Sequence, residues 1–129
     1  MNSLKDLLNE GYPLKEEKPN LPYKIYCDMD GVLTDFESRF EHFTGMHPQE
    51  YEKQKGRAAF WHLIDSEIGV RFWVGMGWMP QGKTLWNFIA PYRPVLLTSP
   101  SRENQSRLGK NLWVRNNLNP KPKVIFAYS

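Results

Sequence analysis

Residues 23–35 decide the fold, and they read YKIYCDMDGVLTD. The segment Tyr23–Cys27 is rich in aromatic and β-branched side chains, which predicts a β-strand. Two carboxylates, Asp28 and Asp30, follow directly, at the carboxyl end of that strand, where open α/β sheets present their ligand sites. Mg²⁺ prefers carboxylate and carbonyl oxygens, which it usually shares with a substrate phosphate. The stretch therefore indicates a Mg²⁺ site; the alternative is a solvated acidic turn with Gly31 at its bend.

Two later segments predict further strands of the same sheet. Pro94–Thr98 is a short, nearly continuous apolar run, typical of a buried parallel strand, and Lys123–Ala127 is the third candidate. Between them we expect a helix with Leu108, Leu112 and Leu118 on one side. The order strand, helix, strand, helix, strand predicts an α/β fold with a right-handed, parallel, Rossmann-like sheet.

The chain divides into an α/β core and an inserted helical cap. The core comprises residues 23–35 and 91–129, and the cap, residues 36–90, is inserted after the first strand. Aromatic residues at helical spacing and several glycines break the cap into short helices, one of which is expected to begin at Pro48. The sequence of residues 1–22 indicates a short N-terminal helix followed by a proline-containing linker.

The composition describes one globular domain. The chain has 129 residues, of which 40% are hydrophobic and 14% aromatic, and this excludes a disordered chain. No apolar run is long enough to span a membrane. The 17 basic residues against 14 acidic ones give a net charge of +3, without the concentrated basic runs that bind nucleic acid polymers. The single cysteine, Cys27, and the lack of an apolar leader indicate a cytoplasmic protein.

Residues 24–35 resemble the first motif of the haloacid-dehalogenase-like phosphohydrolases, a hydrophobic strand followed by Asp-x-Asp-Gly-x-x-x-Asp. The resemblance implies that Asp28 is the nucleophile and Asp30 the general acid and base. It also implies that Mg²⁺ is the cofactor, bound by Asp28 and Asp30, the latter through its backbone carbonyl. The physical chemistry agrees, because a carboxylate attacks phosphorus only when the charge repulsion is neutralised, and the aspartyl-phosphate divides one hard step into two.

Two later motifs resemble the same family. The run VLLT ends at Thr98 and fits the second motif, which implies that Thr98 and Ser99 bind phosphate. The third element is a lysine on the following helix, whose point charge stabilises a phosphoryl group. Lys110 is the best match, with Arg102 and Arg107 as competitors.

A closer resemblance is to the 5'(3')-deoxyribonucleotidase group, and it covers roughly residues 23–127. It is carried by residues 28–37, by Phe72-Trp73 and by the Thr-Ser-Pro run at 98–100. The cap of that group supplies an aromatic pocket for a base, which implies a deoxynucleoside monophosphate as the substrate. The rings that could stack on the base are Phe40, Phe43, Trp73 and Trp78. The alternative for each ring is a place in the core of the cap.

The chain departs from the family after its third predicted strand. The family carries a fourth motif, an acidic pair after a further strand, whereas nothing downstream of Glu103 is acidic in this chain. We therefore expect either a fragment of a longer protein or an incomplete sheet and metal site. The open edge of the first strand invites association, so we expect residues 1–22 or a second chain to cover it, or the protein to form a homodimer.

Other functions remain open at this point. The same fold could hydrolyse another small phosphomonoester, such as a sugar phosphate, or be an inactive homologue that lacks the last metal ligand. A third alternative is a P-loop nucleotide binder, because Gly77–Thr84 reads GWMPQGKT and Val70–Val74 could form the strand before it. Against it, no aspartate follows Thr84 to hold the metal that a P-loop requires.

Overall fold

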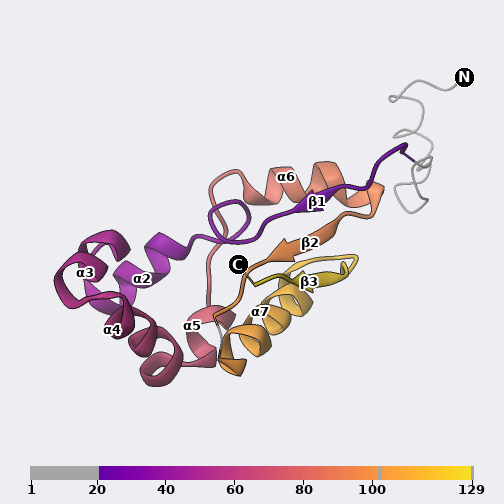
Figure 1. Ribbon diagram of the computed structural model, residues 1–129. Coiled ribbons are helices and arrows are strands. Elements are labelled where there is room, and N and C mark those ends of the chain that lie inside the picture. Colours follow the sequence, from indigo (N-terminus) through magenta and orange to yellow (C-terminus); the bar gives the residue numbers. More distant parts are fainter. Residues whose placement is uncertain (1–20, 102, 129) are drawn as a thin grey trace, which may run out of the picture.

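The sheet predicted from the sequence is present in the computed structural model, which describes residues 21–101 and 103–128. The strands of this part form a three-stranded parallel sheet in the order β1-β2-β3 (Figure 1). Their bounds are Tyr26–Cys27 for β1, Val95–Thr98 for β2 and Val124–Phe126 for β3. The α/β class and the parallel pairing are thus confirmed. No helix of the described residues combines the length and the apolar character needed to cross a membrane.

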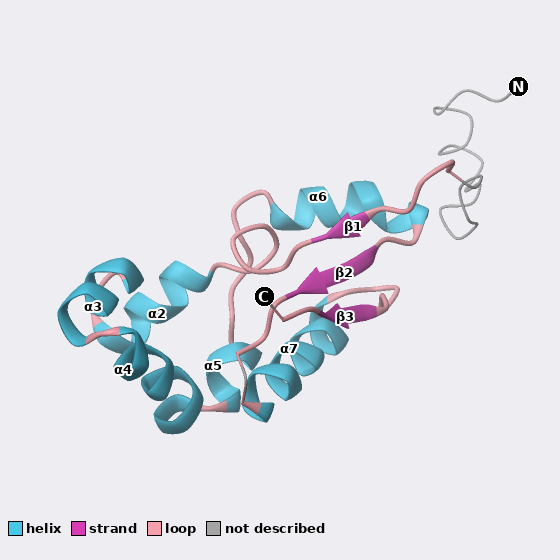
Figure 2. Ribbon diagram, viewed as in Figure 1, coloured by secondary structure: helices cyan, strands magenta, loops and turns pink. Residues whose placement is uncertain are grey.

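Most helices lie between β1 and β2 in the chain. They are α2 Phe36–Thr44, α3 Pro48–Lys55, α4 Arg57–His62, the π-helix η1 Leu63–Ile68, α5 Val70–Val74, α6 Gly82–Ile89 and the short 3-10 helix η2 Ala90–Tyr92; α7, Asn104–Asn117, follows β2. Figure 2 shows α2, α3 and α4 gathered at one end of the molecule, away from the strands. By contrast α6 lies beside the sheet, where its Trp86 lines a cavity together with Lys24 and Val95. The segment 36–90 is therefore divided: some of its helices stand away from the sheet, whereas α6 lies beside it.

The chain begins α2 with a carboxylate cap. Asp35 Oδ1 accepts a hydrogen bond from the Ser38 backbone N–H at 3.1 Å, and Oδ2 accepts one from the Ser38 hydroxyl at 2.8 Å. The helix ends at Gly45, whose φ of 72° is the left-handed conformation that glycine adopts without strain. Pro48 begins α3, as predicted. Asp35, the third acid of the first motif, therefore serves to start a helix.

Two chain segments connect the core with the helices beyond it: residues 33–35 lead out of the core and residues 77–79 lead back. These two segments are hydrogen-bonded to each other. The Asp35 N–H donates to the carbonyl of Gly77 at 2.9 Å, and the Met79 N–H donates to the carbonyl of Leu33 at 2.8 Å. Thr34 and Trp78 form an antiparallel bridge between them. The chain thus leaves the core and returns to it as a pair of hydrogen-bonded segments.

The first strand is shorter than predicted, because pairing begins only near Ile25. The Val95 N–H donates to the carbonyl of Ile25 at 2.9 Å, but the residue before Val95 is Pro94, which has no N–H to extend the ladder. Among the described residues, β1 pairs with β2 alone and forms an edge of the sheet. The N-terminal helix expected within residues 1–22 lies almost entirely outside the described part of the chain.

The buried face of α7 differs from the predicted leucine face. Leu108 is 52% exposed, and the helix instead buries Gly109, Lys110, Trp113 and Val114. The reason is that α7 packs against α5, where Gly109 lets the two helices approach closely: a Cβ on Gly109 would overlap Cβ of Trp73. The three leucines predicted to share one side of this helix therefore differ in burial, since Leu118 is 3% exposed and Leu108 lies on the surface.

Replacing Gly109 by alanine tests this close approach. Alanine is favoured over glycine in a helix by roughly 1 kcal/mol, but overpacking a tight contact costs about 1–3 kcal/mol. We expect Gly109→Ala to lower the free energy of unfolding by roughly 1–2 kcal/mol in a denaturant titration. The control is Gly77→Ala, because a Cβ there has nothing within 4 Å. Equal stability of the two variants would contradict the packing described.

Candidate active site

The loop after β1 turns its apolar side chains inward and its carboxylates outward. The carbonyl of Met29 accepts backbone hydrogen bonds from Val32, Leu33 and Thr34 at 2.8–3.0 Å, which closes a tight turn. Met29 and Leu33 are 1% and 0% exposed and fix the turn in the core. The side chain of the preceding residue, Asp28, is exposed as a result.

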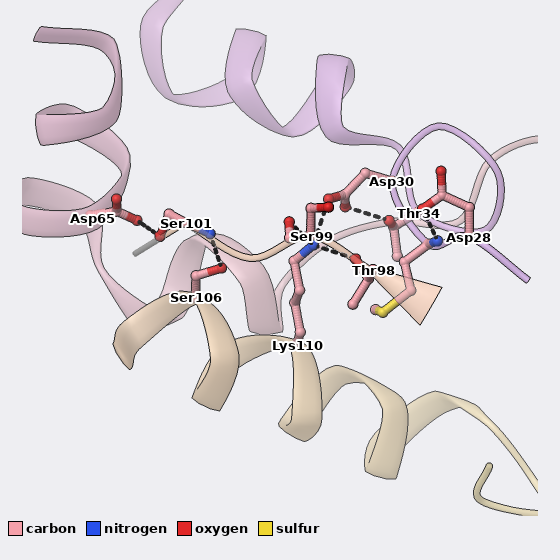
Figure 3. A network of polar contacts seen from close by, with 10 residues as sticks. Asp28, Asp30, Thr34, Asp65, Thr98, Ser99, Ser101, Ser106 and Lys110 are labelled. Atoms are coloured by element: carbon pink, nitrogen blue, oxygen red, sulfur yellow. Dashed lines mark hydrogen bonds and ion pairs between the residues drawn. The ribbon is translucent and has the colours of Figure 1, made fainter. Parts of the chain in front are cut away.

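A buried lysine joins the three motifs predicted from the sequence (Figure 3). Lys110 Nζ donates to Asp30 Oδ2 at 2.7 Å, to Thr98 Oγ1 at 2.7 Å and to the carbonyl of Ser99 at 3.3 Å. Its side chain is 1% exposed, whereas that of Asp30 is 30% exposed. An ammonium group has three protons, so all three have acceptors here. The Thr34 hydroxyl completes the cluster by donating to Asp30 Oδ1 at 2.9 Å.

The lysine is also held from the side of α5. Its Nζ lies 5.0 Å from the centroid of the Trp73 ring, within the range of a cation–π interaction. The Nε1 of this buried tryptophan has no hydrogen-bond partner among the described residues. Of the competing cations, Arg107 lies over the rings of Phe126 and Tyr128, and Arg102 is outside the described residues. The geometry therefore places Lys110, and not Arg107, in the cluster.

Asp28 lies beside this cluster and is only lightly constrained. Its Oδ1 accepts a hydrogen bond from the Met29 N–H at 2.7 Å, and its carbonyl accepts one from the Cys27 thiol at 3.3 Å. Burial, and secondarily the charge of Asp28, raise the pKa of the Cys27 thiol. The thiol therefore stays protonated at neutral pH, and the carboxylate of Asp28 is the charged group beside it at the end of β1.

The residues at this end of the sheet offer a small donor set for a cation. The described residues contain no group of three or more His, Cys, Asp or Glu side chains placed to hold a metal ion. The carboxylate of Asp30 is already bound to Lys110 and Thr34, so Asp28 is the carboxylate left for a cation. Mg²⁺ commonly binds through one or two carboxylates together with substrate phosphate and water. The residues fit a Mg²⁺ held in that way.

The four rings proposed for a base pocket lie in different surroundings. Phe40 is 0% exposed among the rings of Phe36, Tyr51 and Phe60, so it belongs to the core of the cap. Trp73 is 2% exposed and reaches the Lys110 cluster.

The other two rings are half-buried and have other partners. Phe43 lies under the guanidinium groups of Arg39 and Arg71, at 4.6 and 5.8 Å from its centroid. Trp78 makes an edge contact with Trp113, with ring centroids 5.0 Å apart. Trp73 is the ring that makes a cation–π contact with Lys110.

The P-loop alternative loses its structural basis. Val70–Val74, the segment imagined as its strand, is the helix α5. Gly82 begins α6, and the absence of a side chain there serves packing, because a Cβ would lie 2.8 Å from the carbonyl oxygen of Leu33. A P-loop requires a strand that leads into the phosphate-binding turn, and this one follows a helix.

A second polar group, which the sequence analysis did not find, connects η1 to the loop after β2. Asp65 is 5% exposed, and its Oδ1 accepts a hydrogen bond from the Ser101 hydroxyl at 2.8 Å. The Ser101 N–H in turn donates to Ser106 Oγ at 3.1 Å. Asp65, Ser101 and Ser99 line one cavity of about 880 Å³, together with the aromatic residues Trp61 and Tyr128. Nothing in the local sequence marks Asp65, because its partner is 36 residues away.

Comparisons of the chain with protein-family models, with curated proteins and with solved structures found no match.

Removing one partner of the buried ion pair tests its importance for stability. Asp30→Asn leaves a buried ammonium group without its counter-charge, which costs about 3–5 kcal/mol in a fully buried pair. Because Asp30 is 30% exposed, we expect a smaller loss, roughly 2 kcal/mol. Lys110→Met added to Asp30→Asn removes the charge and should restore part of that stability in a denaturant titration. A double variant less stable than Asp30→Asn would contradict this ion pair.

The stability of the protein should depend on pH through Asp65. Burial raises the pKa of this carboxyl; the Ser101 hydrogen bond opposes the shift and the charge of Glu103 adds to it. The folded protein therefore keeps this proton to a higher pH than the unfolded chain does. The stabilisation that results is fully present at pH values below the pKa of Asp65 in the unfolded chain. It is lost as the pH rises through the pKa of Asp65 in the folded protein.

Asp65→Asn is the variant that tests this dependence. We expect a smaller fall in melting temperature between acidic and neutral pH than in the wild-type chain, because the amide keeps an acceptor for Ser101 and does not titrate. Glu67→Gln is the control, since Glu67 is exposed on the same helix. The same pH dependence in Asp65→Asn and wild type would exclude Asp65 as its source.

Proposed function

We propose that this protein is a Mg²⁺-dependent phosphomonoester hydrolase that acts through an aspartyl-phosphate on Asp28. The observation that carries the proposal is the convergence on Lys110 of Asp30 and Thr98, from two motifs far apart in the chain, beside the exposed carboxylate of Asp28. These are the residues that the resemblance to haloacid-dehalogenase-like phosphohydrolases assigns to catalysis.

The first step transfers the phosphoryl group to the protein. A carboxylate oxygen of Asp28 attacks phosphorus and forms a new P–O bond, while the P–O bond to the alcohol breaks. The resemblance assigns the protonation of the departing alkoxide, which leaves as the alcohol, to Asp30, and Asp30 must first lose one of its two donors, Lys110 or Thr34, to carry that proton. When bound, Mg²⁺ would be held by Asp28 and the Asp30 backbone carbonyl, and it would reduce the repulsion between the carboxylate and the phosphate.

The second step returns Asp28 to its starting state. A water molecule attacks phosphorus, Asp30 takes a proton from that water, and the P–O bond to Asp28 breaks. Inorganic phosphate leaves, and Asp30 is protonated for the next cycle. Each carboxylate thus has one role, since Asp30 is held by Thr34 and Lys110 while Asp28 is exposed.

The hydrogen bonds of the free protein indicate how the phosphate would be bound. Thr98 Oγ1 accepts from Lys110, so the hydroxyl proton of Thr98 remains available for a phosphate oxygen. Lys110 has no proton to spare until one acceptor is displaced. The Ser99 carbonyl, at 3.3 Å, is the longest of its three contacts and the one that a phosphate oxygen would replace.

A deoxynucleoside monophosphate is the substrate that we propose. The support is the resemblance to the 5'(3')-deoxyribonucleotidase group, together with a cavity that reaches from Ser99 to the aromatic side chains of Trp61 and Tyr128. Another small phosphomonoester is the second candidate, and an inactive homologue the third. We further propose a cytoplasmic protein without a nucleic acid polymer or membrane as partner, which forms a homodimer through the edge of β1.

Phosphate release from a panel of substrates tests the function. The panel contains 5' and 3' deoxynucleoside monophosphates and sugar phosphates, with Mg²⁺ and with EDTA. We expect release from the nucleotides that EDTA abolishes, and a loss of at least about 10³-fold in Asp28→Asn, which lacks the nucleophile. Glu37→Gln is the control, because Glu37 is exposed and its one ion pair, with His47, lies on the surface.

Two outcomes would contradict the proposal. Release that is equal in Asp28→Asn and wild type would exclude Asp28 as the nucleophile. No release from any substrate by the wild-type chain would favour the inactive homologue. Release from sugar phosphates alone would keep the reaction and replace the nucleotide with the second candidate substrate.

A further inference from the structure

A second cavity lies at the amino ends of the strands, opposite the edge that carries Asp28 and Asp30. It has a volume of about 630 Å³, within the range typical of small-molecule sites. Four cationic side chains line it, and no acidic residue of the described part of the chain does. The four are Lys24, Arg93, Lys121 and Lys123. The sequence analysis and the proposed phosphatase reaction use none of them.

The parallel sheet explains why these cations meet. Lys24 and Arg93 each stand two residues before their strand, β1 or β2, and Lys123 stands directly before β3. In a parallel sheet all strands begin at the same edge (Figure 1), so three residues far apart in the chain arrive at one place. Lys121 joins them from the connection between α7 and β3. The like charges of Lys24, Lys121 and Lys123, gathered in one cavity, repel one another, and an anionic ligand would relieve that repulsion.

The rest of the cavity wall is mainly apolar. Pro91, Pro94, Pro120 and Pro122 line it, as does Trp86, and Asn87 and Asn119 add two polar side chains. Trp86 is 3% exposed, and its Nε1 is buried inside the fold. The wall thus offers positive charge and an apolar surface that contains one aromatic ring.

We propose that this cavity binds a small organic polyphosphate, an anion with several negative charges attached to a flat apolar body, of the nucleoside triphosphate type. The phosphates would pair with the lysines, and the apolar body would lie against the proline and tryptophan wall. This site is separate from the phosphoryl-transfer site, because the two lie at opposite ends of the strands. It would remain even if the protein had no phosphatase activity.

Calorimetric titration of the full chain at low salt tests the proposal, with EDTA present so that no Mg²⁺-dependent hydrolysis occurs. The probes are ATP, inorganic tripolyphosphate and adenosine. We expect saturable binding of ATP at one site, weaker binding of tripolyphosphate and none of adenosine, because charge and apolar contact are both required. No binding of ATP, or tripolyphosphate bound as tightly as ATP, would overturn the ligand class.

Matched double variants locate the site. Lys121→Gln with Lys123→Gln removes two cavity charges, and Lys53→Gln with Lys55→Gln removes two exposed charges from α3. We expect ATP to bind at least about tenfold more weakly to the first variant and with unchanged affinity to the second. Thermal unfolding of both variants without ligand checks that each is folded. Equal weakening in both would show non-specific attraction to net charge and overturn the proposal.

A spectroscopic readout and a competitor complete the test. The indole N–H resonance of Trp86 should shift when ATP is added, while that of Trp113, which donates to the carbonyl of Met76, should not. A shift at Trp73 without one at Trp86 would assign the binding to the phosphoryl-transfer site instead. A single-stranded oligodeoxynucleotide that binds more tightly than ATP, with a steeper salt dependence, would replace the small-molecule ligand with a nucleic acid.

Discussion

The buried ammonium group of Lys110 is the constraint on which the site depends. A lysine that is 1% exposed is stable only if its charge and its three protons are matched, and here the acceptors are Asp30, Thr98 and Ser99. To bring these acceptors together, the loop after β1, the end of β2 and the middle of α7 must meet. The need to match the charge and the protons of Lys110 therefore constrains the position of α7 and the order of the strands, and the same contacts form the candidate site.

The motif residues were the most predictable part of the molecule. Asp28, Asp30 and Thr98 follow strands whose apolar runs are local in the sequence, and parallel strands bring their ends to one edge. Lys110 could be selected as the lysine that best matches the third motif of the family it resembles, and its burial explains why the inward face of α7 carries a charge. The start of α3 at Pro48 was an equally local signal.

The features that could not be predicted depend on contacts between distant residues. Leucine periodicity grouped Leu108 with Leu118, but α7 packs against α5 at Gly109, which leaves Leu108 exposed while Leu118 is buried. Phe40 and Trp73 both lie in an aromatic-rich segment. The sequence alone therefore did not show that Phe40 lies in the core whereas Trp73 reaches Lys110. The partner of Asp65 lies across the fold, and only the structure shows that this carboxyl is buried.

The paired connections at Leu33–Asp35 and Gly77–Met79 have a consequence for how such a protein can change. Because these two segments are bonded to each other, the ends of the inserted chain lie side by side whatever its middle contains. Residues from α2 to η1 could be exchanged for a different helical segment without altering the register of the sheet, provided that α5 stays against Gly109. The helices from α2 to η1 are thereby free to diverge while the residues around Lys110 stay the same.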